Sequence, residues 1–350
     1  MLVMRGNKFL AVIFIFFFCF LPVETFAWEP KSNLSQIFDR YKGFDAEDIP
    51  FDDTCYKGAN IFHTLEWWYF DAVFDNGYSA EYHINIFSKA DVGFAVSMLN
   101  IYQDGQLISH SRKILPLREF IYLPNQPLLW FSGQQILVGQ MDDQGNWFFR
   151  LSIEMDDATI DLEFKSFTKG WKSKILNMWW WGIIQPKADV TGSLTVHGET
   201  INVVGNGYQE HGWDGNFPFV QGWYWGKFCG DTLNIIWTNV IKYPWKQYLM
   251  LVVNQDNGEY VNVPVEDIDF EMTDYEIIDG CKIPTAFHFF VDNGLIYIDI
   301  TAKSQHITHQ QSIGFFNYWR YHCHVTGVLE YNSTIEIIDS IHIMDLTKFW

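Results

Sequence analysis

The residues best suited to chemistry gather in one stretch, Gly205 to Phe228, whose sequence is GNGYQEHGWDGNFPFVQGWYWGKF. The adjacent Glu210 and His211 suggest a carboxylate–imidazole pair that fixes the tautomer of the ring, and Asp214 adds a second carboxyl. Neighbours on a straight strand face opposite ways, so this pair requires a bent backbone. Glycines and Pro218 favour such a bend, and a shaped, non-helical crossing segment is predicted up to Pro218. The alternative is a connector whose rings plug the end of a barrel.

A second candidate group is the run EWWYF, Glu66 to Phe70. A carboxyl group among indoles loses hydration, which raises its pKa and suits it to donate a proton near neutral pH. Glu66 is therefore a candidate acid, and the alternative is a glutamate at a barrel rim that bonds backbone amides. Indole faces stabilise a cation by about 0.5 to 2 kcal/mol, which suits them to a cationic intermediate. The expected catalytic residues are Glu66, Glu210, His211 and Asp214, and the expected ligand-binding residues are Trp67, Trp68, Tyr69, Tyr208, Trp213, Trp223, Trp225 and Trp237.

Alternating sequence patterns predict the elements that position these residues. In YSAEYHINIF the polar Ser79, Glu81, His83 and Asn85 alternate with apolar residues, and the turn DNG precedes this run. That pattern is typical of a β-hairpin. Similar runs separated by DG, QG, NG and HG turns recur to the end of the chain, and long amphipathic helices are scarce. The sequence therefore predicts an antiparallel all-β protein.

An internal repeat indicates two copies of one β fold. WWYFDAVFDNGYSAEYHINIF, which begins at Trp67, resembles WYWGKFCGDTLNIIWTNVI, which begins at Trp223. Later in each copy the triplet Val-Thr-Gly recurs, at Val190 to Gly192 and at Val325 to Gly327. Two echoes in the same order predict tandem barrels, which remove exposed edges and can enclose a ligand.

Length, composition and charge narrow the function. The 350 residues suit two domains, expected over residues 28–205 and, with the motif-bearing connector, over residues 206–350. Aromatic residues form 18% of the chain and line apolar pockets as readily as they fill cores, so the expected partner is a hydrophobic small molecule. The net charge of -19, with no run of Lys or Arg, argues against nucleic acid as a partner.

The N-terminus predicts a secretory signal peptide over residues 1–27. Two basic residues precede an apolar run from Phe9 to Leu21, and Thr25-Phe26-Ala27 places small residues at the -3 and -1 positions. We expect a mature chain that starts near Trp28 and a secreted or extracytoplasmic location. The alternative is an uncleaved segment that tethers the protein to a membrane. Four cysteines of the mature chain would allow one or two disulfides in an oxidising compartment: Cys55, Cys229, Cys281 and Cys323.

The remaining motifs favour chemistry without a metal or cofactor. His322 and His324 alternate on one predicted strand, as zinc ligands can, yet no third ligand stands at a telling spacing, so no metal is expected. The chain lacks Gly-x-Ser-x-Gly, a phosphate-binding glycine loop and a dinucleotide fingerprint, so no cofactor is expected. The run MWWWGIIQP, Met178 to Pro186, is expected to line a pocket or plug a barrel rather than touch a membrane.

Two motifs together resemble a known superfamily: EWWYF at Glu66 to Phe70, and GYQEHGWDGNFPFVQGWYWG at Gly207 to Gly226. The chain is similar to the secreted AttH-like proteins, whose relatives include carotenoid 1,2-hydratases of the CrtC (hydroxyneurosporene synthase) type, kievitone hydratase and some fungal Diels–Alderases. The resemblance covers nearly all of the mature chain and implies two tandem lipocalin-like antiparallel β-barrels.

For the hydratases, the resemblance implies an acid that protonates an isolated isoprenoid double bond, followed by water addition to the tertiary cation. His211 and Trp213 match the His-x-Trp of that family. The family's Tyr-x-Asp pair aligns with Trp237 and Asn239, a departure that removes its acid from this position. An acid in this chain would have to come from Glu66, Glu210 or Asp214.

Together, these features predict a secreted enzyme of two lipocalin-like barrels that hydrates or cyclises an apolar, isoprenoid- or polyketide-like molecule. It would act as a cofactor-independent hydro-lyase or cyclase. Glu66 with Trp67 and Trp68 is expected to approach Glu210 and His211 across one dry pocket. The alternatives are a non-catalytic carrier of a hydrophobic ligand with the same shape, and a structural envelope protein.

Overall fold

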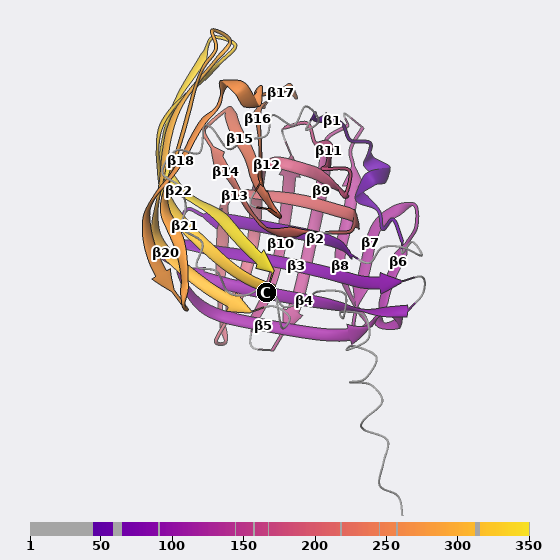
Figure 1. Ribbon diagram of the computed structural model, residues 1–350. Helices are drawn as coiled ribbons and strands as arrows, with labels where there is room; N and C mark the ends of the chain where they lie inside the picture. The colour runs from indigo at the N-terminus through magenta and orange to yellow at the C-terminus, as the bar shows by residue number, and fades with distance from the viewer. Residues whose placement is uncertain are drawn as a thin grey trace, which may run out of the picture. The chain divides into compact units, whose positions relative to one another are not determined.

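The computed structural model describes residues 45–58, 65–89, 92–143, 145–156, 158–166, 168–217, 219–244, 246–256, 258–311 and 316–349. The expected signal peptide over residues 1–27 and the start near Trp28 lie outside these ranges. Within them the regular structure is β strands (Figure 1) and three single-turn 3₁₀ helices, at Phe51–Thr54, Leu117–Glu119 and Val265–Asp267. The predicted all-β class is confirmed. No helix in the described ranges is long and apolar enough to cross a membrane.

The first sheet has thirteen strands and curls into a nearly closed barrel. Its strands pair antiparallel in the order β5 (Gln106–Pro116), β4 (Val92–Gln103), β3 (Tyr78–Lys89), β2 (Leu65–Phe74), β13 (Glu199–Gly215), β12 (Trp179–Val196), β10 (Ala158–Ser166), β9 (Trp147–Met155), β8 (Gln134–Met141), β7 (Gln126–Phe131) and β6 (Phe120–Leu123). Beside them β11 (Trp171–Ile175) pairs with β12 and with β1 (Glu47–Asp48). Alternate residues of each strand point inward and form one apolar core, which includes Phe70, Ile84 and Phe164.

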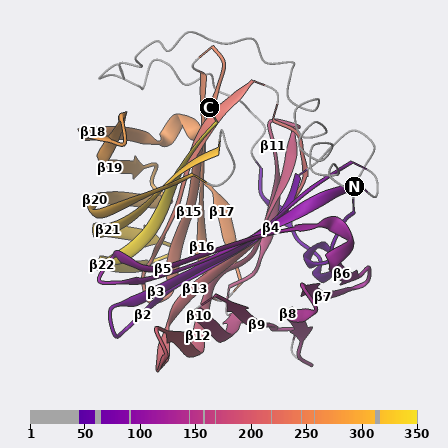
Figure 2. The ribbon, with the colours of Figure 1, turned by 90° about the horizontal axis from the view of Figure 1, so that it is seen from below.

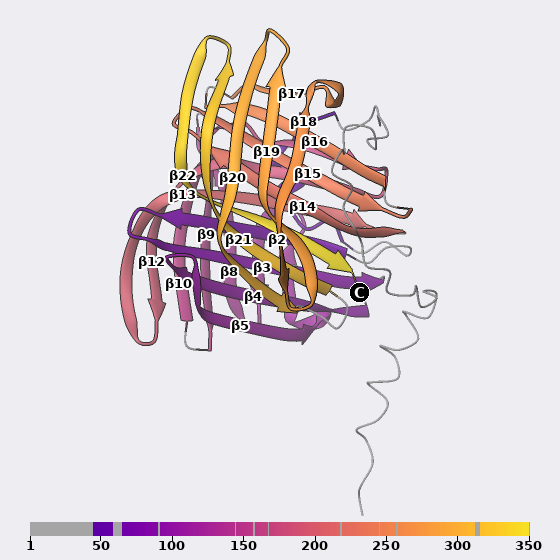
Figure 3. The same ribbon diagram turned by 60° about the vertical axis from the view of Figure 1, so that its left-hand side comes forward.

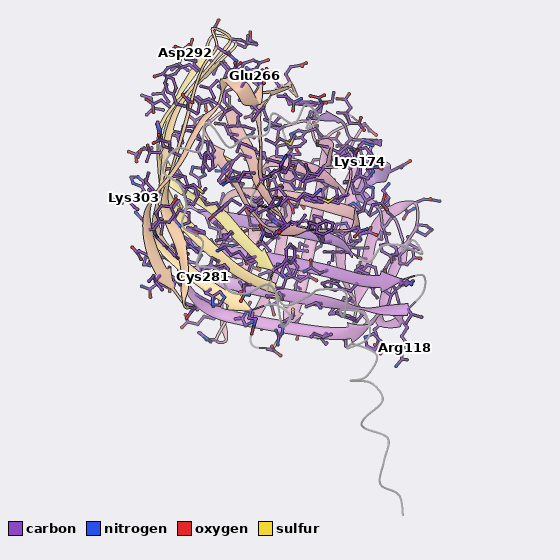
Figure 4. The ribbon with its side chains drawn as sticks, viewed as in Figure 1. Arg118, Lys174, Glu266, Cys281, Asp292 and Lys303 are labelled. Carbon is purple, nitrogen blue, oxygen red and sulfur yellow. The ribbon has the colours of Figure 1, made fainter. Side chains whose placement is uncertain are left out.

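The second sheet has nine strands and a core of its own. Its order is β17 (Tyr260–Asn262), β16 (Lys246–Gln255), β15 (Leu233–Lys242), β14 (Val220–Cys229), β22 (Thr334–Phe349), β21 (Phe316–Tyr331), β20 (Ile296–Gln311), β19 (Cys281–Asp292) and β18 (Asp269–Ile278). Figure 3 shows the long strands β20 to β22 beside the first sheet. On the side turned away from its core this sheet carries exposed charged residues such as Lys303 (Figure 4), as expected for a solvated face.

The repeated Val-Thr-Gly has one structural reason in both sheets. A Cβ atom on Gly192 would lie 2.0 Å from the carbonyl oxygen of Asp161 in β10, and one on Gly327 would lie 2.1 Å from that of Asp299 in β20. The φ angles of the two glycines are 151° and 152°. Each sheet therefore has the same close approach between neighbouring strands, which only glycine permits.

A layer of aromatic residues joins the two sheets. It is formed by the outer face of β2, β12 and β13 and by the facing side of β14, β15 and β16. Buried polar contacts cross it: the Trp171 Nε1 donates to Asn254 Oδ1 at 2.7 Å, and Lys227 bonds the Asp71 carboxylate. The two sheets thus share a third core, and buried polar contacts join them across it.

The motif stretch is mainly a strand. β13 runs without interruption across residue 205 and through the motif to Gly215, and β14 begins at Val220. It pairs with β2 on one side and β12 on the other, so its backbone groups are satisfied in the sheet. The crossing between the sheets is therefore shorter than the segment predicted from Gly205 to Pro218, and Pro218 itself lies outside the described residues.

The four cysteines Cys55, Cys229, Cys281 and Cys323 are free thiols. Cys323 lies inside the second core, where burial raises the pKa of its thiol. No disulfide joins any two of these four cysteines, contrary to the one or two expected for an oxidising compartment.

Candidate active site

The pairing of β2 with β13 divides the candidate residues between two faces of the first sheet. Tyr69 lies opposite Glu210, and Trp68 lies opposite His211. Successive side chains on a strand point to opposite faces. The inner face therefore carries Glu66, Trp68, His211 and Trp213, and the outer face carries Trp67, Tyr69, Tyr208 and Glu210. These candidates do not share one pocket, contrary to the expectation from sequence.

On the inner face, His211 pairs with Glu66 rather than with its neighbour Glu210. The His211 Nε2 lies 2.9 Å from Glu66 Oε1, and its Nδ1 donates to the carbonyl oxygen of Asp53 at 2.6 Å. The backbone N–H of Lys57 donates to the same Glu66 oxygen at 2.8 Å. Burial raises the pKa of Glu66, and the bonds from His211 and the backbone oppose that rise.

These contacts hold the segment of residues 51–58 over the end of the first barrel. The Trp68 ring stacks on the His211 ring with centroids 4.4 Å apart, and its Nε1 donates to the carbonyl oxygen of Thr54 at 3.3 Å. Both nitrogens of His211 are occupied by the protein. Glu66 thus bonds a backbone amide and His211, as in the alternative interpretation, in which its role is structural rather than catalytic.

On the outer face, Glu210 accepts three hydrogen bonds. Trp67 Nε1 donates to its Oε1 at 2.8 Å, while Trp181 Nε1 and the Tyr208 hydroxyl each donate to its Oε2 at 2.7 Å. Burial raises the pKa of Glu210, and these three donors oppose the rise without cancelling it. The sheet thus places a desolvated carboxyl among aromatic rings.

Glu210 lines a cavity of about 80 Å³ between the first and second sheets. The cavity lies where β2, β3 and β13 face β14, β21 and β22. Figure 2 shows β2 and β3 of the first sheet beside β21 and β22 of the second. Most of its wall is apolar. Its aromatic residues include Trp67, Tyr69, Trp179, Trp181, Trp223 and Trp225, and its polar residues include His83, Asn85, Glu210, Thr238, Tyr318, Asp345 and Thr347.

A buried ion cluster borders this cavity and joins the sheets. Arg320 on β21, 1% exposed, lies 2.8 Å from Glu81 Oε1 on β3 and 2.6 Å from Asp345 Oδ1 on β22. The Tyr318 hydroxyl donates to Asp345 Oδ2 at 2.7 Å. Two carboxyl groups thus share one guanidinium, and all three side chains are buried.

The pKa values of the two carboxyl groups in this cluster shift in opposite directions. Burial alone would raise the pKa of Glu81, but Arg320, His83 and Asn100 together lower it to about 2. Burial and the charge of Glu81 raise the pKa of Asp345 well above its usual value, against the attraction of Arg320. The arrangement favours an ionised Glu81 and a protonated Asp345, because one guanidinium cannot compensate two buried anions.

Seven of the predicted site residues lie outside the lining of the cavity: Glu66, Trp68, Tyr208, His211, Trp213, Asp214 and Trp237. Asp214 is exposed, with a positive φ of 57°. Trp213 packs inside the first barrel, its ring 5.9 Å from that of Trp180. Trp237 is fully buried in the core of the second sheet, on the face turned away from the cavity, because its neighbour Thr238 lines the cavity instead. No group of three or more possible metal ligands occurs among the described residues.

Comparison with solved structures supports the architecture. A protein assigned as AttH from Nitrosomonas europaea gives a TM-score of 0.61 at 15% identity, over 87% of this chain and 97% of that one. The chain has the AttH-like fold. Kievitone hydratase from Nectria haematococca gives 0.58 at 13% identity, over 89% and 98% of the two chains. CghA in complex with Sch210972 gives 0.54 at 11% identity, over 90% and 97%. No family model matches the sequence, and no curated protein matches it.

The AttH-like fold confirms the resemblance drawn from the two motifs and the lipocalin-like architecture it implied. Several residues that line the cavity or form the ion cluster beside it were not predicted as site residues from the sequence: Glu81, His83, Tyr318, Arg320 and Asp345. The sequence does contain a signal for Glu81 and His83, since both lie on the polar side of the alternating run in β3. That pattern normally indicates a solvent-facing side, and here the second sheet covers it.

Proposed function

We propose that this protein binds an apolar, isoprenoid- or polyketide-like small molecule in the cavity between its sheets and hydrates or cyclises it by acid catalysis, without a cofactor. The observation that carries the proposal is the position of Glu210 and Asp345. These carboxyl groups come from different sheets, line one largely aromatic cavity, and have pKa values raised by burial. The fold shared with a protein named kievitone hydratase supports hydration as the reaction class.

The two carboxyl groups suit different roles in this reaction. Asp345 holds the proton and transfers it to a carbon of the substrate double bond, which leaves a cation at the other carbon. Glu210 accepts hydrogen bonds from three donors, which favour its ionised form, so in this reaction it acts as a fixed negative charge near that cation. The faces of Trp223 and Trp225 add roughly 0.5 to 2 kcal/mol each. Water or a second group of the substrate then bonds to the cation, and a proton is released.

The test combines ligand binding with turnover. Asn85 lines the cavity and is half-buried, so Asn85→Trp should fill it and weaken binding of the neutral apolar probe Nile red at least tenfold. Isoprenoid alkenes and polyketide-like polyenes should give products that gain one water, labelled when heavy-oxygen water is used, or cyclised isomers of unchanged mass. Mass spectrometry measures both products.

Glu66→Gln is the control, since Glu66 lies on the same strand pair as Asn85 but on the opposite face of the sheet, away from the cavity. The weakened contact between residue 66 and His211 should lower the melting temperature by a few degrees, which corresponds to about 1 to 3 kcal/mol in the free energy of unfolding. The affinity for Nile red should stay unchanged. Equal loss of Nile red affinity in Glu66→Gln and Asn85→Trp would argue against the cavity as the binding site.

A non-catalytic carrier is the second candidate function, and one observation favours it. The three donors satisfy the Glu210 carboxylate within the protein, as they would if its role were to fix the cavity wall. If the protein is a carrier, the unmodified protein should bind Nile red, the Asn85→Trp variant should bind it weakly, and neither should convert any of the substrates. A structural envelope protein would bind Nile red in neither form.

We also propose that residues 1–27 direct export and that the protein acts outside the cytoplasm. The support is the sequence pattern of a basic start, an apolar run and Thr25-Phe26-Ala27. N-terminal sequencing of the protein from its host is expected to begin near Trp28 in the extracytoplasmic fraction. Soluble cytosolic protein with an intact Met1 would contradict export.

A further inference from the structure

His83 presents an unpaired ring nitrogen at the cavity. The side chain projects from β3, is 7% exposed, and lines the cavity. Its Nδ1 lies 3.0 Å from Glu81 Oε1, whereas its Nε2 is buried and has no hydrogen-bond partner in the described part of the chain. The rings of Tyr69 and Tyr318 lie 6.5 Å and 6.2 Å away, so the imidazole is held between aromatic neighbours.

Glu81 determines which nitrogen of His83 carries the proton. Arg320 at 2.8 Å and the Asn100 side-chain amide at 2.7 Å keep the Glu81 carboxylate ionised, so it can only accept hydrogen bonds. The proton of the neutral imidazole therefore lies on Nδ1, and Nε2 offers its lone pair. A ring oriented by a carboxylate, with its other nitrogen free, is the arrangement of a general base.

We propose that His83 is the base of this cavity and that the natural ligand carries a hydroxyl group, phenolic or enolic, on an apolar skeleton. This inference rests on the proposed function and specifies its substrate class. Buried acceptors without a donor are costly, so a ligand hydroxyl that bonds Nε2 removes a penalty that a hydrocarbon leaves in place.

The base completes the proton balance of a ring closure. Asp345 gives its proton to the double bond, and the ligand oxygen bonds to the resulting cation as its O–H bond breaks. The hydroxyl proton passes to Nε2 of His83, and Glu81 stabilises the imidazolium that forms. One proton enters and one leaves the substrate, so the product is an isomer, and proton return from His83 to Asp345 through water restores the protein.

The test compares 2-naphthol with naphthalene, which share a skeleton and differ by the hydroxyl. The full-length protein should bind 2-naphthol about tenfold or more tightly than naphthalene in fluorescence titrations. Excited 2-naphthol is a strong acid and transfers its proton to a base in contact with it, so the bound probe should show naphtholate emission. His83→Phe should lose both the preference and the naphtholate emission while binding naphthalene as before.

His83→Gln separates the acceptor from the base. Its side-chain oxygen can accept the hydroxyl but is not basic, so it should keep part of the preference for 2-naphthol and lose the naphtholate emission. Naphthalene binding with no preference for 2-naphthol, or naphtholate emission that survives in His83→Phe, would overturn the assignment of His83 alone. Failure of both probes to bind would overturn the cavity as a ligand site, and with it the proposed function.

Discussion

Asp345→Asn is expected to lower turnover by about 10² to 10⁴, the usual contribution of a positioned acid. Burial and the charge of Glu81 raise the pKa of Asp345, so the carboxyl holds a transferable proton where an ordinary aspartate is ionised. Asn has the same shape and keeps an oxygen for the Tyr318 hydroxyl, but it cannot donate that proton. The rate is measured on any substrate found in the mass-spectrometric survey.

The pH dependence has a definite sign. Because the protonated form of Asp345 is the acid, turnover should fall as pH rises through its raised pKa. Asp339→Asn is the matched control, since Asp339 lies on the same strand with an exposed side chain. It should change neither rate nor pH profile. Unaltered turnover in a folded Asp345→Asn protein would remove Asp345 from the mechanism.

Arg320→Met is expected to lower the free energy of unfolding by about 3 to 5 kcal/mol, the usual result of removing one partner from a buried ion cluster. Arg320 is 1% exposed and stands between Glu81 and Asp345, which belong to different sheets. Without it, the buried Glu81 carboxylate loses its main compensating charge. Urea unfolding followed by tryptophan fluorescence measures the difference.

Arg150→Met is the matched control for this loss. Arg150 pairs with Asp161 at 2.7 Å, but both side chains are largely exposed, so its removal should cost about 0 to 1 kcal/mol. Equal destabilisation by the two substitutions would mean that the Arg320 cluster contributes no more than a surface pair.

The same cluster predicts how stability depends on pH. The folded-state pKa of Glu81 is lowered to about 2, below its usual 4.5, so its contribution is complete above the unfolded value. That contribution should be lost as pH falls from about 4.5 towards 2. In Arg320→Met this loss should shrink, because the cation that lowers the Glu81 pKa is gone.

The fold was largely predictable from local patterns. The alternation in Tyr78 to Phe87 predicts a strand because a pleated backbone sends successive side chains to opposite faces. The repeated Val-Thr-Gly predicts two related units, since a close strand approach that only glycine permits occurs in both. The two motifs at Glu66 and Gly207 carry the resemblance to AttH-like proteins, whose fold the structure shares.

The site was predictable only in part. Glu210, Trp67, Tyr69, Trp223 and Trp225 were expected from their types and lie at the cavity. The pairing of Glu210 with His211 was wrong, because the motif backbone stays extended and adjacent side chains diverge.

The sequence by itself determined which residues of each strand share a face, and tertiary structure decided what covers each face. In β3 the apolar set fills the barrel, and the polar set that contains Glu81 and His83 resembles a solvent-facing side. The second sheet buries that set against Arg320 and Asp345, more than 200 residues further along the chain. Burial removes water from these charges and shifts their pKa values, and no local pattern contains that information because the covering strands are distant in sequence.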